Sequence, residues 1–329
     1  MSRRLEILRL LADGREHSGE ALAASLSISR AAVWKHVQQL QQWGLEVQAA
    51  AGRGYRLGCP VDLLDEASLR AGLPELARDR LRRLTVAEEI DSTNEALLGV
   101  ADLPAGRFDA CLAEYQARGR GRRGREWVAP FGAGLCLSVS WRFSEAPSQL
   151  SALSLAAGVA VRRALAQHGV VDAMLKWPND ILHAGRKLGG ILCELRAEVA
   201  GPAYVVVGVG INVTLPERVR RGIEASGLQP VALADLGLAA LPSRSALAAS
   251  LIGQLALVLV EFEQSGFGPF LDEWRAADAL AARPVRLQHG EQVVEGIARG
   301  IDRDGALVLE AGGRLERVVS GEVTVRPVA

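Results

Sequence analysis

The densest group of side chains with chemical potential lies between Glu114 and Trp127, where the sequence reads EYQARGRGRRGREW. Residues 118–125, called here the arginine loop, consist of five arginines and three glycines. Arginine keeps its charge and carries a planar set of donors that fits phosphate or carboxylate. Glycine lets the backbone approach a ligand closely. We therefore predict a mobile loop that closes over an anionic ligand.

Three other interpretations compete for the arginine loop. Gly119–Gly124 matches the dinucleotide pattern GxGxxG, but that pattern requires a helix directly after it, and Pro130 and Gly132 oppose one here. A disordered RNA-binding or targeting tract would lie in low-complexity surroundings, whereas strand-like patterns flank this segment. A solvated basic surface loop is the simplest alternative, and the sequence leaves it open.

A second polar group stands between two predicted strands, in the sequence KWPND. It places Lys176, Asn179 and Asp180 around Pro178, which cannot continue a strand ladder. Lys187 opens the following strand beside two glycines, which allow close backbone approach to a ligand. These groups suit a ligand or a metal-bound phosphate. Lys187 would equally suit a sheet edge, where lysine discourages aggregation.

Polar residues also follow two other predicted strands. Ser92, Thr93 and Asn94 precede a predicted helix that starts at Glu95, so helix capping alone would explain them. Asn212 ends a buried strand in the sequence GVGIN, where it could bind a ligand or satisfy a turn. The glycines of that sequence are a weak signal by themselves.

Several chemistries are poorly supported by this sequence. It holds no Ser-His-Asp arrangement and no GxxxxGK[ST] pattern, and its five histidines form no ligand pair. What remains is phosphate or carboxylate chemistry that depends on positioning and charge stabilisation. Activation of a carboxylate by ATP fits this description. The carboxylate attacks the α-phosphorus, pyrophosphate leaves, and arginines, a lysine and Mg²⁺ stabilise the growing charge.

Composition indicates a cytoplasmic globular protein of two or three domains. The chain has 329 residues with a net charge of zero, so any nucleic-acid site must be local. The N-terminus lacks an apolar signal core, and no run of 18 apolar residues predicts a membrane span. The cysteines are far apart and fit reduced thiols, mostly buried; they are Cys59, Cys111, Cys136 and Cys193.

Residues 1–62 are predicted to form a winged helix-turn-helix domain. Three helical patterns precede a hairpin around residue 52, and Ser18 and Ser29 are good caps for the second and third helices. In such domains the second helix of the turn enters the major groove. Residues 1–60 hold eight basic and five acidic residues, a net charge of +3. The predicted DNA contacts are Ser29, Arg30, Trp34, Lys35 and Gln38 on the third helix and Arg53 in the wing. A helical domain that contacts protein is the alternative.

Residues 63–279 are predicted to form a mixed α/β domain, and residues 280–329 a small β-barrel-like domain. The first begins with a connector to residue 83 whose arginines, between positions 78 and 83, are expected to be solvated. Strands are expected near 85–90, 109–115, 135–141, 188–192 and 204–211, and helices near 95–100, 150–165, 243–264 and 268–279. Short strand patterns separated by glycine turns fill the C-terminal part. The fold class is therefore α+β.

The motifs GRGRRGREW, KWPND, RKLGGIL and GVGIN, in this order and with DSTN upstream, resemble those of the biotin–protein ligases. The N-terminal winged helix makes the chain similar to the bifunctional members, which also repress the biotin operon. The resemblance implies a central domain of the biotin/lipoate ligase type and a C-terminal SH3-like β-barrel. It also implies two steps: biotin and MgATP give biotinyl-5′-AMP, and biotin then passes to a lysine of the biotin carboxyl carrier protein of acetyl-CoA carboxylase. In repressor members the adenylate promotes a homodimer that binds operator DNA.

The resemblance also implies roles for individual residues. The residues implied to act in catalysis are Lys187, Arg122 and Arg120. The biotin site would comprise Ser92, Thr93, Asn94, Gln116, Gly119, Arg120, Arg122, Lys187, Gly190 and Gly208. The nucleotide would contact Arg120, Arg122, Arg123, Trp127, Lys176, Asn179 and Asn212. Asp180 would support Mg²⁺.

One departure from the family and two alternatives remain at this point. Residues 213–240 contain no aromatic residue, whereas family members often stack one on the adenine there; Leu228 or Val231 would have to substitute. Trp34 is large for base recognition, so the operator sequence is not predicted. The first alternative is a lipoate–protein ligase, which would lack the arginine loop and the winged helix. The second is a ligand-sensing transcription factor without catalysis.

Overall fold

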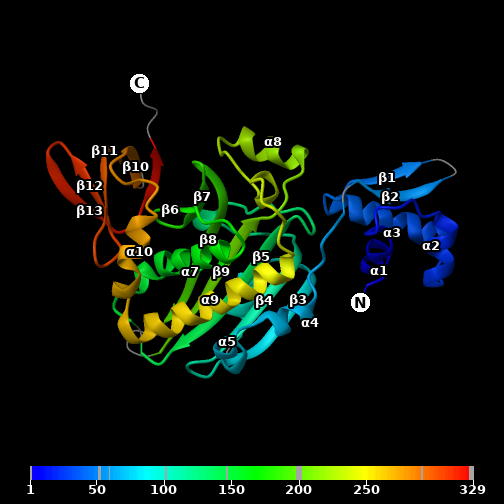
Figure 1. Ribbon diagram of the computed structural model, residues 1–329, viewed down its shortest axis with the longest axis horizontal. Coiled ribbons are helices and arrows are strands. Elements are labelled where there is room, and N and C mark those ends of the chain that lie inside the picture. Colours follow the sequence, from blue (N-terminus) through cyan, green and yellow to red (C-terminus); the bar gives the residue numbers. More distant parts are fainter. Residues whose placement is uncertain are drawn as a thin grey trace.

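The computed structural model describes residues 2–50, 53–58, 60–100, 102–145, 147–197, 202–289 and 292–325. An N-terminal helical unit lies at one end of an elongated molecule, a central α/β unit lies in the middle, and a C-terminal sheet lies at the other end (Figure 1). Cys59 and the predicted turn residues 51, 52 and 290 fall outside the described residues.

The N-terminal unit has the predicted winged-helix pattern. Its helices are α1 (Arg3–Leu11), α2 (Gly19–Leu26) and α3 (Arg30–Gln42), and its hairpin strands are β1 (Val47–Ala50) and β2 (Gly54–Leu57). Ser18 and Ser29 cap α2 and α3 as predicted, because each side chain accepts a backbone N–H three residues later. Leucines, isoleucine and valines from the three helices form one buried core.

The central unit is built on a seven-stranded sheet in the order β3-β4-β5-β9-β8-β7-β6. β3 and β4 are parallel, and the other neighbours are antiparallel. The predicted site residues therefore meet at one end of the sheet, where β3, β4 and β9 finish and β5 and β8 begin. The bounds are β3 Leu81–Ile90, β4 Phe108–Gln116, β5 Gly134–Phe143, β6 Met174–Lys176, β7 Asp180–His183, β8 Arg186–Ala197 and β9 Ala203–Asn212.

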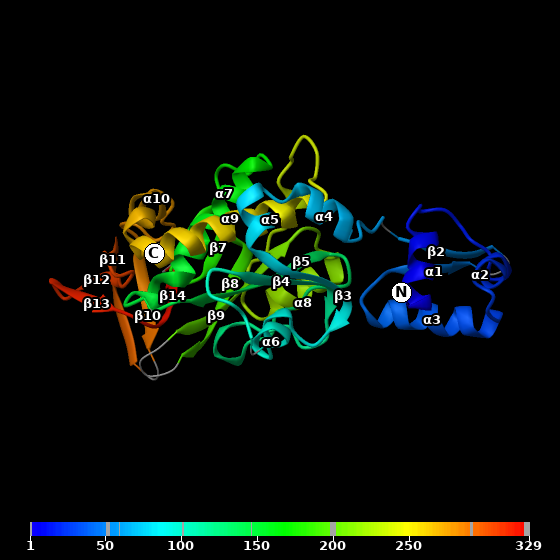
Figure 2. The same cartoon turned by 90° about the horizontal axis from the view of Figure 1, so that it is seen from below.

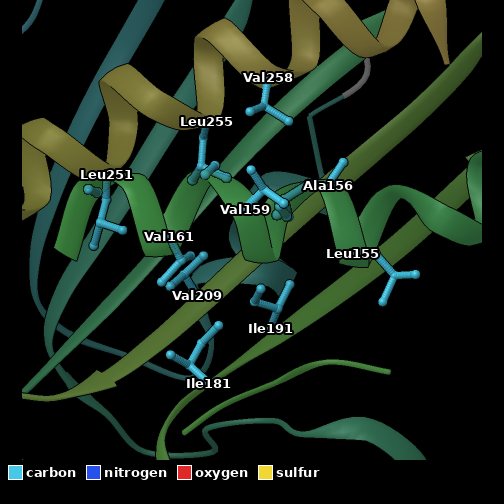
Figure 3. Packing of buried hydrophobic residues seen from close by; sticks show 14 of the residues in the cluster. Leu155, Ala156, Val159, Val161, Ile181, Ile191, Val209, Leu251, Leu255 and Val258 are labelled. Carbon is cyan, nitrogen blue, oxygen red and sulfur yellow. The ribbon is translucent and has the colours of Figure 1, made fainter. Parts of the chain in front are cut away.

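Two helices cover one face of this sheet in successive layers. Valine and leucine side chains of α7 (Leu153–Gln167) lie between the sheet and α9 (Arg244–Ser265), as Figure 3 shows. By length and composition α9 could cross a membrane, which the sequence did not lead us to expect. However, 67% of its most apolar window is buried inside the protein, which is the environment of a core helix.

The opposite face of the sheet carries the short helix α6 (Thr93–Leu98), as Figure 2 shows. The alternation in β5 explains how the two faces differ. Leu135 and Leu137 join the large core with α7 and α9, whereas Cys136 and Ser138 alternate with them and face the α6 side. The sheet thus has an apolar face for the core and a more polar face for a ligand.

The connector to the central unit corrects one prediction. It forms two short helices, α4 (Glu66–Gly72) and α5 (Glu75–Arg80), and its arginines are not simply solvated. Arg82 forms an ion pair with the fully buried Asp109, and Arg80 donates to the Gly106 carbonyl at 2.9 Å. These arginines satisfy carbonyls and a carboxylate at the end of the sheet opposite to the predicted site residues.

The C-terminal strands form an antiparallel sheet in the order β13-β12-β11-β10-β14. Within the described residues the sheet is open, because no pairing joins β13 to β14. The predicted helix 268–279 is shorter than expected, a 3₁₀ turn followed by α10 (Leu271–Ala276). The strands are β10 Pro284–His289, β11 Gln292–Ile301, β12 Leu307–Ala311, β13 Arg314–Val318 and β14 Glu322–Val325.

The described cysteines are free thiols, as predicted. Burial raises the pKa of Cys111 and of Cys136 to about 11, and that of Cys193 to about 12. All three therefore remain protonated at neutral pH.

Asp278 is a buried carboxylate where the central unit meets the C-terminal sheet. Its side chain is 6% exposed, and Oδ1 accepts the Leu280 N–H at 2.8 Å. Oδ2 has no hydrogen-bond partner among the described residues. Burial raises the pKa of Asp278 from 3.8 to about 6. Ionisation of this carboxyl therefore opposes folding.

We predict that Asp278→Asn stabilises the protein at neutral pH, because the amide keeps the acceptor for Leu280 and removes the buried charge. Since the folded-state pKa lies above 3.8, the penalty is absent below that pH and complete above about pH 6. The expected gain in the free energy of unfolding is about 2–3 kcal/mol at pH 7.5. It should vanish as the pH falls below about 4.

Denaturant titrations of both proteins at several pH values test this prediction. Exposed Glu224, changed to glutamine, is the control and should show no such trend. A gain for Asp278→Asn that is independent of pH would contradict the assigned cause.

Candidate functional site

A cavity of about 1500 Å³ opens at the end of the sheet where the predicted site residues meet. It extends from the central sheet toward the N-terminal unit and to strand β14 of the C-terminal sheet. Gly119 is not among the lining residues. The predicted ligand residues that line it are Ser92, Thr93, Asn94, Gln116, Arg120, Arg122, Arg123, Trp127, Lys176, Asn179, Asp180, Lys187, Gly190, Gly208 and Asn212.

The arginine loop is folded as a tight hairpin. The Trp127 N–H donates to the Gly119 carbonyl at 2.9 Å, and the Gly121 N–H donates to the Arg125 carbonyl at 2.7 Å. A single 3₁₀ turn, Arg122–Gly124, forms the tip of this hairpin, with φ of 57° at Arg123. The helix that a dinucleotide fingerprint requires is absent from this segment, so that alternative fails.

Three of the loop arginines are tied to carboxylates on three different elements. Arg118 pairs with Asp91, Arg120 Nη2 lies 3.1 Å from Glu194 Oε1, and Arg125 pairs with Glu322 of β14. These pairs hold the hairpin over the cavity, so the simple solvated loop is a poor description. They also leave most arginine donors available to an anion.

Arg122 differs from these three because its hydrogen-bond partner is neutral. Its Nη1 donates to Asn179 Oδ1 at 3.4 Å, a long contact. Burial and the neighbouring Arg123 lower the pKa of Arg122, whereas Asp180 opposes this shift. Arginine nevertheless remains charged. Within the described residues Arg122 forms no ion pair, and a half-buried cation in this state favours an incoming anion.

Trp127 lies against the glycines of the central strands. A Cβ added at Gly210 would stand 2.5 Å from its ring, and one at Gly190 would stand 3.7 Å away. The Trp127 Nε1–H is buried and has no acceptor among the described residues. The cavity therefore has an aromatic wall that packs directly on the strand glycines.

A hydrogen-bonded cluster forms the polar part of the cavity wall. The Thr93 N–H donates to Gln116 Oε1 at 2.8 Å, and Ser138 Oγ lies 2.6 Å from Asn94 Oδ1. Ser92 occupies the N-cap position of α6 but makes no capping hydrogen bond. The capping explanation for this group is therefore wrong, and Thr93 and Asn94 instead reach strands β4, β5 and β8.

The lysines of KWPND and RKLGGIL share one carboxylate. Lys187 Nζ lies 2.6 Å and Lys176 Nζ 3.8 Å from the Asp180 oxygens. Burial lowers the pKa of Lys176, partly offset by Asp180. Residues 229–231 cover the Lys187 backbone, since its N–H donates to the Gln229 carbonyl at 2.7 Å. Lys187 thus lines the cavity and does not lie on an exposed sheet edge.

Metal binding finds little support in the described residues. They contain no group of three His, Cys, Asp or Glu side chains that could hold a metal ion. Asp180, the predicted Mg²⁺ residue, is already paired with two ammonium groups. A cation held by this carboxylate would be repelled by both lysines.

Asn212 has a structural part in the cavity wall. Its Nδ2 donates to the Lys187 carbonyl at 3.2 Å and to the Val231 carbonyl at 3.0 Å. The aromatic-free segment that follows forms helix α8 (Glu217–Ala225), whose Val219 and Ile223 line the cavity together with Leu228. Val231 is buried and does not line it.

Several residues of the site were not predicted from the sequence. Ser138 and Glu194 connect to Asn94, and Glu322 reaches the loop from the C-terminal sheet. Glu194 had a signal, since it is an acidic residue inside the apolar strand sequence ILCEL. No sequence signal marked Glu322, because its role depends on how the C-terminal sheet packs against the central unit.

The predicted DNA residues lie on the outer surface of the N-terminal unit. Trp34 is 57% exposed, and Lys35 and Gln38 are exposed beside it on α3. Arg30 pairs with Glu20 at 3.1 Å, and Arg53 of the wing lies 3.7 Å from Glu16. Ser29 caps α3. A basic, exposed helix face and a basic wing are thus available to a phosphate backbone.

The N-terminal unit also contacts the segment that follows the arginine loop. The rings of Trp43 and Phe131 stack with centroids 4.5 Å apart, and the Phe131 N–H donates to the Trp43 carbonyl at 3.0 Å. Phe131 is 1% exposed and belongs to the core of the N-terminal unit. The end of the loop segment is therefore anchored in that unit.

Comparison with known proteins gives three matching regions. Residues 86–212 match the Biotin/lipoate A/B protein ligase family, residues 3–56 an HTH domain, and residues 283–326 the Biotin protein ligase C terminal domain. The chain is 41% identical to the Bifunctional ligase/repressor BirA of Escherichia coli K12, over 98% of this chain and 97% of the relative.

Two further comparisons cover about three quarters of the chain. The Biotin--[acetyl-CoA-carboxylase] ligase of Mycobacterium tuberculosis is 41% identical over 79% of this chain and 95% of its own length. The structure of the Aquifex aeolicus biotin protein ligase in complex with biotin and ATP matches with a TM-score of 0.60 and 26% identity. That match covers 74% of this chain and 99% of the other.

Proposed function

The chain belongs to the biotin protein ligases, in the group of bifunctional ligase/repressors, and on this basis we propose how its residues carry out a two-step reaction. The protein is an ATP-dependent biotin ligase and a DNA-binding repressor. In the first step biotin and MgATP give biotinyl-5′-AMP and pyrophosphate. In the second step a lysine of the biotin carboxyl carrier protein of acetyl-CoA carboxylase receives the biotinyl group.

The observation that carries the proposal is the arrangement of charge around one cavity. A neutral hydrogen-bonding cluster (Thr93, Asn94, Gln116) suits the uncharged ring system of biotin. The cations Arg122 and Lys187 suit the biotin carboxylate and the α-phosphate. Biotin carries its carboxylate at the far end from its rings, so we propose that its two ends use these two parts of the cavity wall.

We assign adenylation to positioning and charge stabilisation. A biotin carboxylate oxygen attacks the α-phosphorus, the bond from that phosphorus to the bridging oxygen breaks, and pyrophosphate leaves. Lys187 and Arg122, with Arg120 beside them, stabilise the negative charge that grows on the phosphoryl oxygens. Arg123, Lys176 and Asn179 are proposed to contact the nucleotide, and Asp180 to hold the two lysines in place.

Magnesium is proposed to arrive with ATP as part of the substrate. The described residues do not fit a protein-held Mg²⁺ at Asp180, because two ammonium groups already neutralise that carboxylate. We therefore replace the expected role of Asp180 as a metal ligand with that of a lysine-positioning group.

We also propose the second reaction step, the cellular location and the domain boundaries of the protein. In the second step the neutral lysine amine of the carrier attacks the mixed anhydride carbon, and AMP leaves. The reaction partners, ATP and operator DNA, favour a cytoplasmic location. The division into residues 1–62, 63–279 and 280–329 stays a proposal, supported by the order of the helical unit, the central sheet and the C-terminal strands.

We predict that Lys187→Ala and Arg122→Ala each abolish biotin-dependent exchange of pyrophosphate into ATP, because each removes charge stabilisation from the transition state. Lys35→Ala, which removes a lysine from the distant α3 surface, is the control and should leave exchange intact. Near-normal exchange in both site variants would count against the site. Exchange that requires lipoate would indicate the sister ligases, and none with either acid would indicate a ligand sensor.

Repressor activity gives a second prediction, on salt dependence. Lysine and arginine that bind phosphates release counterions, so operator affinity should fall steeply as salt rises. Lys35→Ala should weaken binding at low salt and reduce the slope of log affinity against log salt by about one. Lys187→Ala, which leaves α3 unchanged, is the reciprocal control. In the absence of biotin its operator affinity should equal that of the unaltered protein. A flat salt response in the unaltered protein would exclude this helix face as a DNA contact.

Homodimer formation is proposed to use the open edge of β8. The pairing of β7 with β8 ends at Gly190, and residues 193–197 pair only with β9 in the described part of the chain. Leu195 on this segment is 51% exposed. An unpaired strand edge with an exposed apolar side chain is a surface onto which a second copy can add its own strand.

We predict that Leu195→Asp weakens dimerisation in the presence of biotinyl-5′-AMP, because a charge would be buried at the strand pairing. Sedimentation velocity over a concentration series measures the effect. Leu257→Asp changes a 39% exposed leucine on α9 and is the matched control. Equal association of both variants would show that the dimer uses another surface.

A further inference from the structure

Glu194 of β8 joins the polar wall of the cavity to the arginine loop. Its side chain is 21% exposed. Oε2 accepts a hydrogen bond from Asn94 Nδ2 at 2.8 Å, and Oε1 lies 3.1 Å from Arg120 Nη2. One carboxylate thus contacts a residue of α6 and a residue of the hairpin that covers the cavity.

The contact with Arg120 orients a side chain that would otherwise be mobile. The Arg120 side chain is 46% exposed, so solvent alone would let it sample many rotamers. The ion pair engages one of its two terminal nitrogens, and arginine carries five N–H donors. The remaining donors can therefore reach an anion in the cavity while Glu194 holds the guanidinium.

The contact with Asn94 fixes the direction of that amide. Asn94 Nδ2 also donates to the Leu192 carbonyl at 3.2 Å, so both amide protons are used on β8. Asn94 Oδ1 must then face Ser138, whose Oγ lies 2.6 Å away. Glycine is required beside it, because a Cβ at Gly208 would stand 2.2 Å from Oδ1. The side chain is 4% exposed and cannot turn without losing these bonds.

Glu194 itself stands outside the ligand cavity. Asn94 and Arg120 line the large cavity, whereas Glu194 lines a neighbouring hollow of about 260 Å³. Its contacts with residues of the large cavity run through Asn94 and Arg120, which it holds.

We propose that Glu194 is a positioning residue for biotin and its adenylate, which sets Asn94 and Arg120 in their binding geometry. This inference rests on the proposed ligase function. A ligand that arrives at a preformed Asn94–Glu194–Arg120 bridge does not have to order these side chains. The bridge also ties the hairpin to the sheet and so retards release of the adenylate.

If Glu194 competed with the ligand for Arg120, the KM for biotin would change in the opposite direction. If Glu194 drew Arg120 away from the ligand, its removal would free a cation for the carboxylate or phosphate, and biotin would bind more tightly. The direction of the change in the KM for biotin therefore distinguishes positioning from competition.

The test compares Glu194→Gln with the full-length unaltered protein. Glutamine keeps the size of the side chain but loses the charge that holds Arg120. Pyrophosphate exchange gives the KM for biotin, the KM for ATP and kcat, and rapid dilution of preformed enzyme–adenylate complex gives its rate of dissociation. Thermal unfolding reports whether the fold is retained.

We expect Glu194→Gln to raise the KM for biotin and the dissociation rate of the adenylate, each roughly tenfold, the size of a lost hydrogen bond between charged groups. The KM for ATP and kcat should change much less. Glu194→Asp keeps the charge with a shorter reach and should lie between the two proteins. Glu66→Gln is the matched control, because Glu66 forms an exposed ion pair with Arg70 on α4 and does not line the cavity. It should leave both quantities within about twofold, as exposed pairs contribute little.

Three outcomes would overturn the inference. An unchanged KM for biotin and unchanged adenylate release would show that the bridge has no role, and a lower KM would show competition. Loss of active protein with unaltered constants in the remainder would indicate a merely structural carboxylate. If the unaltered protein shows no biotin-dependent exchange, the proposed function fails instead, so the two failures are distinguishable.

Discussion

The structure depends on a buried ion pair between Glu114 and Arg244. Their side chains are 4% and 1% exposed, and Arg244 Nη1 lies 2.5 Å from Glu114 Oε2. The pair binds four chain segments together, because Glu114 also accepts the Leu64 N–H and Arg244 donates to the carbonyls of Asp62 and Gly134. Removal of one partner from such a pair typically costs about 3–5 kcal/mol, since the other charge stays buried. Glu114 lies four residues before the arginine loop, and Gly134 lies nine residues after it. The pair therefore fixes the chain on both sides of the loop.

The same frame connects the N-terminal unit to the ligand cavity. Phe131, three residues before Gly134, lies inside the core of the N-terminal unit and stacks on Trp43. Arg4 of α1 lies over the Trp43 ring at 4.4 Å and reaches Glu88 and Glu89, close to the end of β3 that leads to Ser92. The segment that leads to the polar wall and the segment that follows the arginine loop therefore both contact the DNA-binding unit. The N-terminal unit is therefore in direct contact with chain segments that border the cavity.

Sequence patterns predicted the local features well and the contacts between distant strands poorly. The caps at Ser18 and Ser29 depend on spacing within one helix, so the sequence identified them, and the motif residues converge because sheet ends gather them. The group Ser92–Asn94 also looked like a cap, yet its hydrogen bonds run to β4, β5 and β8, which no local pattern reveals. Arg82 likewise appeared solvated because its partner Asp109 lies on the adjacent strand. Long-range pairing decides these roles, and sequence spacing does not record it.

The glycines of GVGIN illustrate how a weak signal acquires a physical meaning. Glycine weakens a strand interior, since it adds backbone entropy and packs no side chain. β9 nevertheless has glycine at 208 and 210, next to Asn94 and Trp127. A Cβ at either position would collide with these side chains, at 2.2 Å and 2.5 Å respectively. The glycines therefore make β9 locally less stable, but they allow the Asn94 amide and the Trp127 ring to lie directly on the strand. These glycines provide space for Asn94 and Trp127, which line the cavity, whereas phosphate-binding glycines provide backbone donors. A GxG pattern alone therefore does not identify the chemistry.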